Sequence, residues 1–159
     1  MVINTVNALE QVIGIDIGKI GNVALSTGFQ YIVKNDIDVS RLFRQIFQYE
    51  NVSIIALEEH DDYSKNEKKS IKGLFIANDL IVRYVKLRLN AKIKIVYVDK
   101  FKSSIICNKC KFVDRASRVA PWLFECTCCG ERINADVNAA LNIKHAAEEQ
   151  LNNGNMIWH

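Results

Sequence analysis

The sequence is poor in the features that mark membrane and secreted proteins. It has one proline, seven glycines and no long apolar run, because Asp, Lys or Gly interrupts each apolar stretch. A membrane span needs about 20 consecutive apolar residues, and the first ten residues, MVINTVNALE, lack the basic and apolar regions of a signal peptide. With 49% hydrophobic residues the 159-residue chain can bury a core, which excludes global disorder. We therefore expect a soluble, cytoplasmic protein of one ordinary domain.

The net charge of +3 conceals an uneven distribution along the chain. Residues 1–62 carry four Lys or Arg and nine Asp or Glu, whereas residues 63–159 carry 17 and nine, so the two parts have net charges of −5 and +8. A basic region is typical of nucleic-acid-binding proteins. An ordinary solvated surface would give the same counts, so charge alone does not decide the function.

Cysteine is absent from the first 106 residues, and all five cysteines lie within a short segment. They form the pairs Cys107-Asn-Lys-Cys110 and Cys126-Thr-Cys128-Cys129, with fifteen residues between the pairs. This is the spacing of a zinc ribbon. An odd number of cysteines and the absence of an export signal argue against disulfides. We predict one structural Zn²⁺ bound by Cys107, Cys110, Cys126 and Cys129, with Cys128 as the spare.

The hydrophobic pattern predicts strands and helices that alternate around this ribbon. The expected strands lie at residues 11–17, 22–26, 29–34, 53–57 and 93–98, and the expected helices at 39–49, 71–89 and 135–151. Ser40 is the expected cap of the first helix, and Gly73 the weak point of the second. The order βββαβαβ with a final α is similar to the ribonuclease H-like α/β arrangement, a mixed sheet. We expect residues 1–104 and 131–159 to form this domain, and residues 105–130 the inserted zinc ribbon.

Three acidic residues occupy the ends of these elements, where that arrangement would bring them together. Asp16 lies in the first strand within the sequence GIDIG, Glu58 follows the apolar run SIIAL, and Asp136 begins the last helix. Each acid alone has an ordinary explanation, such as a helix cap. Their joint order and spacing favour a shared site, with Glu59 on the opposite face of the sheet as an internal control.

Four segments together resemble one family. GIDIG, IIALEEH, the two cysteine pairs and ADVNAALNI are similar to the catalytic half of TnpB-type proteins, which are transposon-associated, RNA-guided nucleases with a RuvC-like domain and a zinc ribbon. The resemblance implies that Asp16, Glu58 and Asp136 are the catalytic carboxylates. Two departures stand out: Ala135 occupies the position where the family usually has arginine, and the first carboxylate is already at residue 16, so we expect the guide-binding half to be lacking.

The chemistry that these acids would support is phosphodiester hydrolysis. Two divalent cations stabilise the attacking and leaving oxygens, and Mg²⁺ or Mn²⁺ prefers oxygen ligands. We therefore expect a metal-dependent DNA endonuclease in which Asp16, Glu58 and Asp136 hold Mg²⁺ or Mn²⁺, with a guide RNA or a partner chain supplying specificity. The candidate phosphate-binding residues are Lys19, Lys68, Lys69, Lys72, Arg83, Arg115, Arg118 and Arg132. For Trp122 and Phe124 we expect packing beneath the cysteine pairs rather than stacking on a base.

The sequence allows three other functional interpretations, of which the first stays open and the other two are weaker. The first is a structure-specific Holliday-junction resolvase that acts as a homodimer. The second is a catalytically idle remnant whose ribbon binds DNA, and retention of all three acids argues against it. The third takes GIDIG as the phosphate loop of actin-like and sugar-kinase ATPases, which need a second, duplicated domain that 159 residues do not contain.

Overall fold

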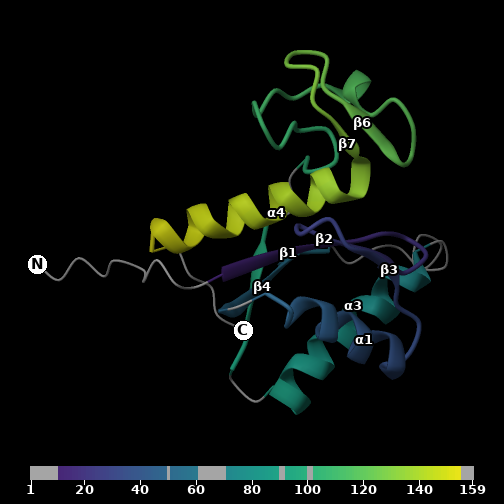
Figure 1. Ribbon diagram of the computed structural model, residues 1–159, viewed down its shortest axis with the longest axis vertical. Helices are drawn as coiled ribbons and strands as arrows, with labels where there is room; N and C mark the ends of the chain where they lie inside the picture. The colour runs from purple at the N-terminus through teal and green to yellow at the C-terminus, as the bar shows by residue number, and fades with distance from the viewer. Residues whose placement is uncertain (1–10, 50, 61–70, 90–91, 100–101, 155–159) are drawn as a thin grey trace, which may run out of the picture.

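A five-stranded mixed sheet forms the centre of the protein (Figure 1). The computed structural model describes residues 11–49, 51–60, 71–89, 92–99 and 102–154. The sheet strands are β1 (Gln11–Ile17), β2 (Asn22–Leu25), β3 (Gln30–Ile32), β4 (Val52–Glu58) and β5 (Lys94–Val98). Their order is β3-β2-β1-β4-β5, with β1 antiparallel to β2 and parallel to β4. The predicted ribonuclease H-like fold class is confirmed.

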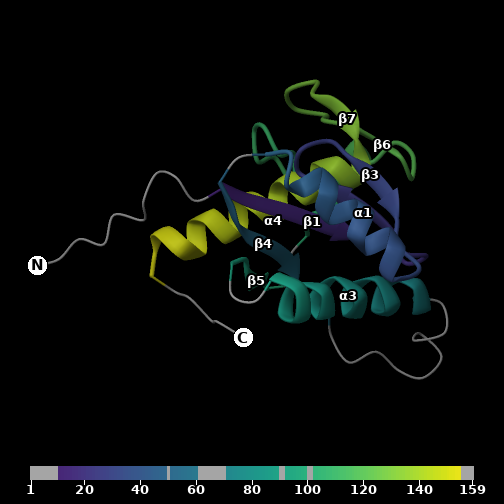
Figure 2. The same cartoon turned by 60° about the horizontal axis from the view of Figure 1, so that its bottom comes forward.

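Helices cover both faces of the sheet (Figures 1 and 2). Helices α1 (Asp36–Ile46) and α3 (Lys72–Tyr84) lie on one face, and α3 continues as a π-helix over Val85–Leu89. Helix α4 (Ala135–Asn152) crosses the other face. Among the described residues, no helix is both long enough and apolar enough to cross a membrane.

Alternation along the strands divides the core into two layers. In β1, Ile13, Ile15 and Ile17 pack with α1 and α3, whereas Val12 packs with α4. Gly14 lies on the α4 side, where a Cβ atom would come within 2.1 Å of the Ala140 carbonyl oxygen. The missing side chain therefore lets α4 lie directly on β1, and this close crossing sets the position of the start of α4.

Two local expectations for the helices were wrong. Helix α1 begins at Asp36, because Asn35 accepts hydrogen bonds from two backbone N–H groups and acts as its cap, whereas Ser40 lies inside the helix and donates to the Asp36 carbonyl. Gly73 is not a weak point of α3. A Cβ atom there would lie 2.3 Å from the Ile20 carbonyl carbon, so the glycine allows α3 to start against the turn after β1.

The cysteine segment forms a small unit beside the first turn of α4 (Figure 1). It contains a short 3₁₀ helix at Arg115–Ser117 and a two-stranded sheet of β6 (Leu123–Glu125) and β7 (Arg132–Asn134). Its core consists of Cys107, Phe124, Cys126 and Ala135. Phe124 is fully buried, as expected, but Trp122 is 68% exposed, so the packing predicted for Trp122 is wrong.

Candidate functional site

The three acidic side chains come from strands and a helix that meet on the α4 side of the sheet. Side chains alternate along a strand, so Asp16 follows Val12 and Gly14 to the α4 face of β1. Glu58 likewise follows Ile54 and Ala56 on β4. Asp136 lies in the first turn of α4.

Glu59, one residue further along the chain, belongs to the other face. Its charge, after burial, raises the pKa of the Tyr97 phenol, which packs with the α1 and α3 layer. Glu58, by contrast, acts on Asp16. The two neighbouring carboxylates therefore act on different titratable groups, and both residues line a pocket with Phe75 and Tyr97.

Asp16 is the carboxylate on which the electrostatics of the site converge. Burial, and then the charges of Asp136 and Glu58, together raise its pKa from 3.8 to about 7, while Arg118 opposes the shift. A carboxylic acid with this pKa is partly protonated near neutral pH. Burial and the two neighbouring carboxylates destabilise the charged form of Asp16. A bound divalent cation would offset this negative charge, so the arrangement favours metal binding.

Asp136 accepts hydrogen bonds from two other parts of the chain. Asn22 of β2 donates to Oδ2 across 3.1 Å, and Arg118 of the ribbon donates to Oδ1 across 3.3 Å. The same Arg118 nitrogen also donates to the Pro121 carbonyl at 2.8 Å. Asn134 caps α4 by accepting from the Asp136 backbone N–H, so the start of the helix is fixed next to the acid.

The turn that presents Arg118 is itself held by an acidic side chain. Asp114 accepts from the Ala116 backbone N–H at 2.9 Å and from the Thr127 hydroxyl at 2.7 Å. These two bonds hold the pKa of the Asp114 carboxyl below its usual value. The turn joins the two halves of the ribbon and brings its arginine to the carboxylates.

Glu58 accepts a hydrogen bond from the Ser103 hydroxyl at 3.2 Å. Ser103 is 5% exposed and lies in the segment between β5 and the first cysteine pair. Sequence reasoning did not identify Ser103 or Asn22 as site residues. Ser103 lies in the stretch VDKFKSS before Cys107, and Asn22 begins β2; the pattern of the sequence gives neither residue a role.

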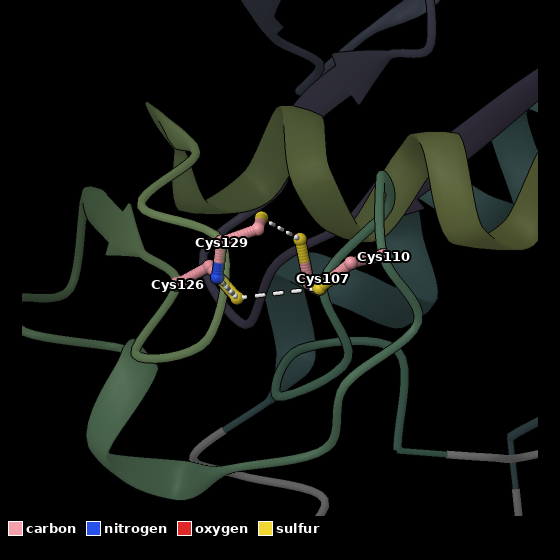
Figure 3. A group of neighbouring side chains, drawn as sticks. All are labelled: Cys107, Cys110, Cys126 and Cys129. Carbon is pink, nitrogen blue, oxygen red and sulfur yellow. Dashed lines mark hydrogen bonds between the residues drawn. The ribbon is translucent and has the colours of Figure 1, made fainter.

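The four predicted zinc ligands form a compact group (Figure 3). One sulfur atom from each of Cys107, Cys110, Cys126 and Cys129 lies within 4.8 Å of the others, and Cys128 is exposed outside the group. The Cys107–Cys129 and Cys110–Cys126 sulfur distances are 3.7 and 3.6 Å. Tetrahedral Zn²⁺ with Zn–S bonds of about 2.3 Å requires sulfurs about 3.8 Å apart. The donor set therefore fits a metal ion of this type.

The two cysteine pairs use the same backbone turn. Lys111 N–H donates to the Cys107 carbonyl and Gly130 N–H to the Cys126 carbonyl, each at 2.9 Å. Lys111 has φ 64° and Gly130 has φ 71°, so both residues take the left-handed conformation. Lys111 in the first pair is equivalent to Gly130 in the second pair. A left-handed backbone costs more free energy for lysine than for glycine.

The predicted phosphate-binding residues are scattered. Arg118 lies at the carboxylates, Arg132 is 3.8 Å from Glu125 within the ribbon, and Arg83 pairs at 2.8 Å with Asp36 on the α1 and α3 face. The remaining candidates within the described residues are exposed, namely Lys19, Lys72 and Arg115. Lys68 and Lys69 lie outside the described residues. The structure brings Arg118 alone of the described candidates into hydrogen-bond contact with one of the three acids.

Comparisons with known proteins agree with the resemblance drawn from the sequence. Residues 82–143 match the family model of the Cas12f1-like TNB domain. The chain is 35% identical over 79 residues to the CRISPR-associated endodeoxyribonuclease Cas12f1 of Sulfoacidibacillus thermotolerans. That alignment covers 47% of this chain and 19% of the relative, so the chain spans only a small part of the relative's length.

Solved structures show the same fold. The Cas12f1 protein in the Cas12f1-sgRNA-target DNA complex has a TM-score of 0.54 at 22% identity, and the match covers 83% of this chain and 49% of that one. RuvC of T. thermophilus, in complex with a Holliday junction substrate, has a TM-score of 0.57 at 17% identity, with 93% and 98% coverage. The matches to Cas12f1 confirm the resemblance to TnpB-type nucleases with a RuvC-like domain.

Proposed function

We propose that this chain is the catalytic part of a DNA endonuclease that depends on divalent metal ions, with Asp16, Glu58 and Asp136 as the metal ligands. The observation that carries the proposal is that the carboxylates of Glu58 on β4 and Asp136 on α4 both act on the buried Asp16 of β1 and raise its pKa. The similarity to an endodeoxyribonuclease over 79 residues supports it. We further propose that the four cysteines bind structural Zn²⁺.

The residues of the site divide the work of hydrolysis. Bound Mg²⁺ or Mn²⁺ would supply the nucleophile from water and stabilise the charge on the reacting oxygens. Asp16 is influenced by both other acids, so it would hold the ions together with Glu58 and Asp136. Asn22 and Arg118 hold Asp136 in place. Arg118 also places a positive charge where a DNA phosphate would enter.

DNA is the proposed substrate, and a guide RNA or a partner chain is the proposed source of specificity. The Cas12f1 structure that shares the fold is a complex with sgRNA and target DNA. On this chain, Arg118 of the ribbon contacts Asp136 of α4, Arg115 is exposed on the ribbon, and Lys19 and Lys72 lie exposed near the turn after β1. These cations are suited to contact the DNA backbone rather than its bases.

A second candidate function is cleavage of branched DNA by a homodimer. The observation that favours it is coverage: the match spans 98% of the T. thermophilus RuvC chain, a protein solved with a Holliday junction, but 49% of the Cas12f1 chain. A catalytically idle, DNA-binding ribbon is the remaining alternative.

The test is incubation of the purified, zinc-loaded chain with labelled single-stranded, duplex, flapped and four-way-junction DNA in Mg²⁺ and in Mn²⁺. Cleavage that is lost in Asp16→Asn and kept in Glu59→Gln would support the carboxylate site. Symmetric cutting restricted to four-way junctions, by a dimer, would favour the resolvase. Binding without cleavage in both metals and on all substrates, with or without a guide RNA, would contradict the proposal and favour the idle ribbon.

A further inference from the structure

We propose that Ser103 orients the carboxylate of Glu58, and that Asn142 of α4 is the residue that positions Ser103. This inference rests on the proposed function, because it concerns how one of the three metal-binding acids is held. Nothing in the sequence pattern assigned either residue a role. The contacts that connect them join three segments far apart in the chain: β4, the segment before the first cysteine pair, and α4.

The first contact is the hydrogen bond from the Ser103 hydroxyl to Glu58 Oε1 at 3.2 Å. Glu58 is the last residue of β4, so its backbone is fixed by pairing with Val98 of β5 while its side chain extends beyond the sheet. A glutamate side chain has several rotatable bonds, and a bond to one oxygen restricts the direction in which the other oxygen points. Bonds to a charged acceptor are stronger than neutral ones.

The second contact holds the serine itself. Asn142 is 3% exposed, and its Nδ2 donates to the Ser103 carbonyl at 2.9 Å and to the Ile106 carbonyl at 2.8 Å. Ser103 lies in a turn, where the backbone has no regular partners of its own. A buried amide is costly unless it is hydrogen-bonded, and here both protons of one amide are used to fix this turn. The side chain of Asn142 therefore fixes the position of Ser103 relative to α4.

Asn138, one helical turn earlier on α4, has a different task. Its Nδ2 donates to the Ile106 carbonyl at 2.8 Å, and its Oδ1 accepts from the Asn108 backbone N–H at 3.0 Å. Asn108 lies within the first cysteine pair. Both asparagines thus hold the Ile106 carbonyl; Asn138 also fastens the first cysteine pair, whereas Asn142 also fastens the residue that contacts Glu58. Because α4 also carries Asp136, one helix determines the placement of two of the three acids.

The experiment measures Mn²⁺ binding to the full, zinc-loaded chain by isothermal titration calorimetry, without DNA, with Asp16→Asn as the baseline for ions bound elsewhere. We expect Ser103→Ala to weaken Mn²⁺ binding about tenfold, which corresponds to about 1.4 kcal/mol. Ser103→Thr, which keeps the hydroxyl, should restore most of the affinity. Ser104→Ala is the matched control, since Ser104 is the adjacent, partly exposed serine, and it should bind Mn²⁺ as the wild type does.

A merely structural role would produce a different result. In that case Ser103→Ala would lower the melting temperature while leaving Mn²⁺ affinity unchanged, and this outcome would overturn the inference. Asn142→Ala should weaken Mn²⁺ binding as much as Ser103→Ala does, and the two effects should not add in the double variant. If Asn142→Ala fails to fold, the serine variants still decide the matter. Wild-type protein that binds no more Mn²⁺ than Asp16→Asn would instead overturn the proposed function itself, and this inference with it.

Discussion

Arg118 of the ribbon lies 3.3 Å from Asp136 of α4 and so joins the ribbon to the acidic side chains. The residue before Asp136 is Ala135, whose side chain is fully buried against Cys107 and Phe124. An arginine at position 135 has no room for its long side chain in that core. The positive charge next to Asp136 therefore comes from Arg118. It takes the place of the arginine that the family usually has at the position of Ala135.

Neutralising any one of the three acids should stop cleavage. We expect Asp16→Asn, Glu58→Gln and Asp136→Asn each to reduce the cleavage rate by at least about 10³-fold, because each removes a ligand for the ions that carry the chemistry. Binding of DNA in Ca²⁺ should remain within about threefold of the wild type, since phosphates are held by cations. Glu59→Gln is the control and should cut at the wild-type rate. Equal losses in Glu59→Gln and Glu58→Gln would contradict the assignment.

The stability of the protein without Mg²⁺ or Mn²⁺ should fall as the pH rises through the range in which Asp16 loses its proton. The folded-state pKa of about 7 is above the unfolded value of 3.8. The folded state therefore binds a proton that the unfolded state has already released, and the free energy of unfolding decreases between these two pKa values. We expect the wild type to lose about 2 kcal/mol more than Asp16→Asn between pH 5.5 and pH 8. Urea unfolding at both pH values measures this difference, and parallel curves for the two proteins would count against it.

Zinc content should depend on four of the five cysteines. Elemental analysis should find one Zn²⁺ per chain in the wild type and in Cys128→Ser, and Cys126→Ser should lose it. Hydrogen exchange after chelation should increase over residues 105–134 while the sheet stays protected. Chelation should also slow cleavage, because Arg118 and the contacts of Asn138 belong to the ribbon. Zinc retention in Cys126→Ser together with zinc loss in Cys128→Ser would show that the ligand set is different.

Removal of the Arg118 side chain should affect catalysis more than binding. We expect Arg118→Ala to lower the cleavage rate by about 10²-fold, the loss typical of one electrostatic contact in an active site. The affinity for DNA should fall only a few-fold, since other cations also contact phosphates. Arg132→Ala, which removes a cation that pairs with Glu125, serves as the control. Single-turnover cleavage and fluorescence anisotropy separate the two effects; a purely structural arginine would show neither loss once the variant is folded.

Trp122 should stack on a base of single-stranded DNA. Its indole is 68% exposed. Its backbone carbonyl accepts from the Ala135 N–H at 3.0 Å, one residue before Asp136. Stacking on an aromatic residue contributes about 1–3 kcal/mol per base, so Trp122→Ala should weaken binding of single-stranded DNA at least about fivefold. In a Trp158→Phe background, quenching of the remaining tryptophan by DNA reports the contact directly. Unchanged fluorescence on saturation with DNA would exclude it.

Much of the fold and part of the site were predictable because their signals are local. Alternation of apolar residues in QVIGIDI and the continuous run in SIIAL encode which strand faces are buried, and these segments form β1 and β4 as expected. The cysteine spacing predicts two equivalent turns, one in each cysteine pair, and the four sulfur atoms lie together as expected. Asp16, Glu58 and Asp136 became candidates because they lie at or near the ends of such segments; their roles in metal binding stay a prediction.

The contacts that surround those acids depended on the tertiary structure. Ser103 meets Glu58 across 45 residues of sequence, Asn142 meets Ser103 across 39, and Arg118 meets Asp136 across 18. None of these pairs shares a strand or a helix, so no periodicity connects them. They are brought together because Gly14 lets α4 lie directly on β1, and this crossing places the asparagines of the helix beneath the ribbon. Sequence by itself determined which segments are buried and which residues are candidates to bind ions, whereas the packing of α4 on the sheet decided which of them touch.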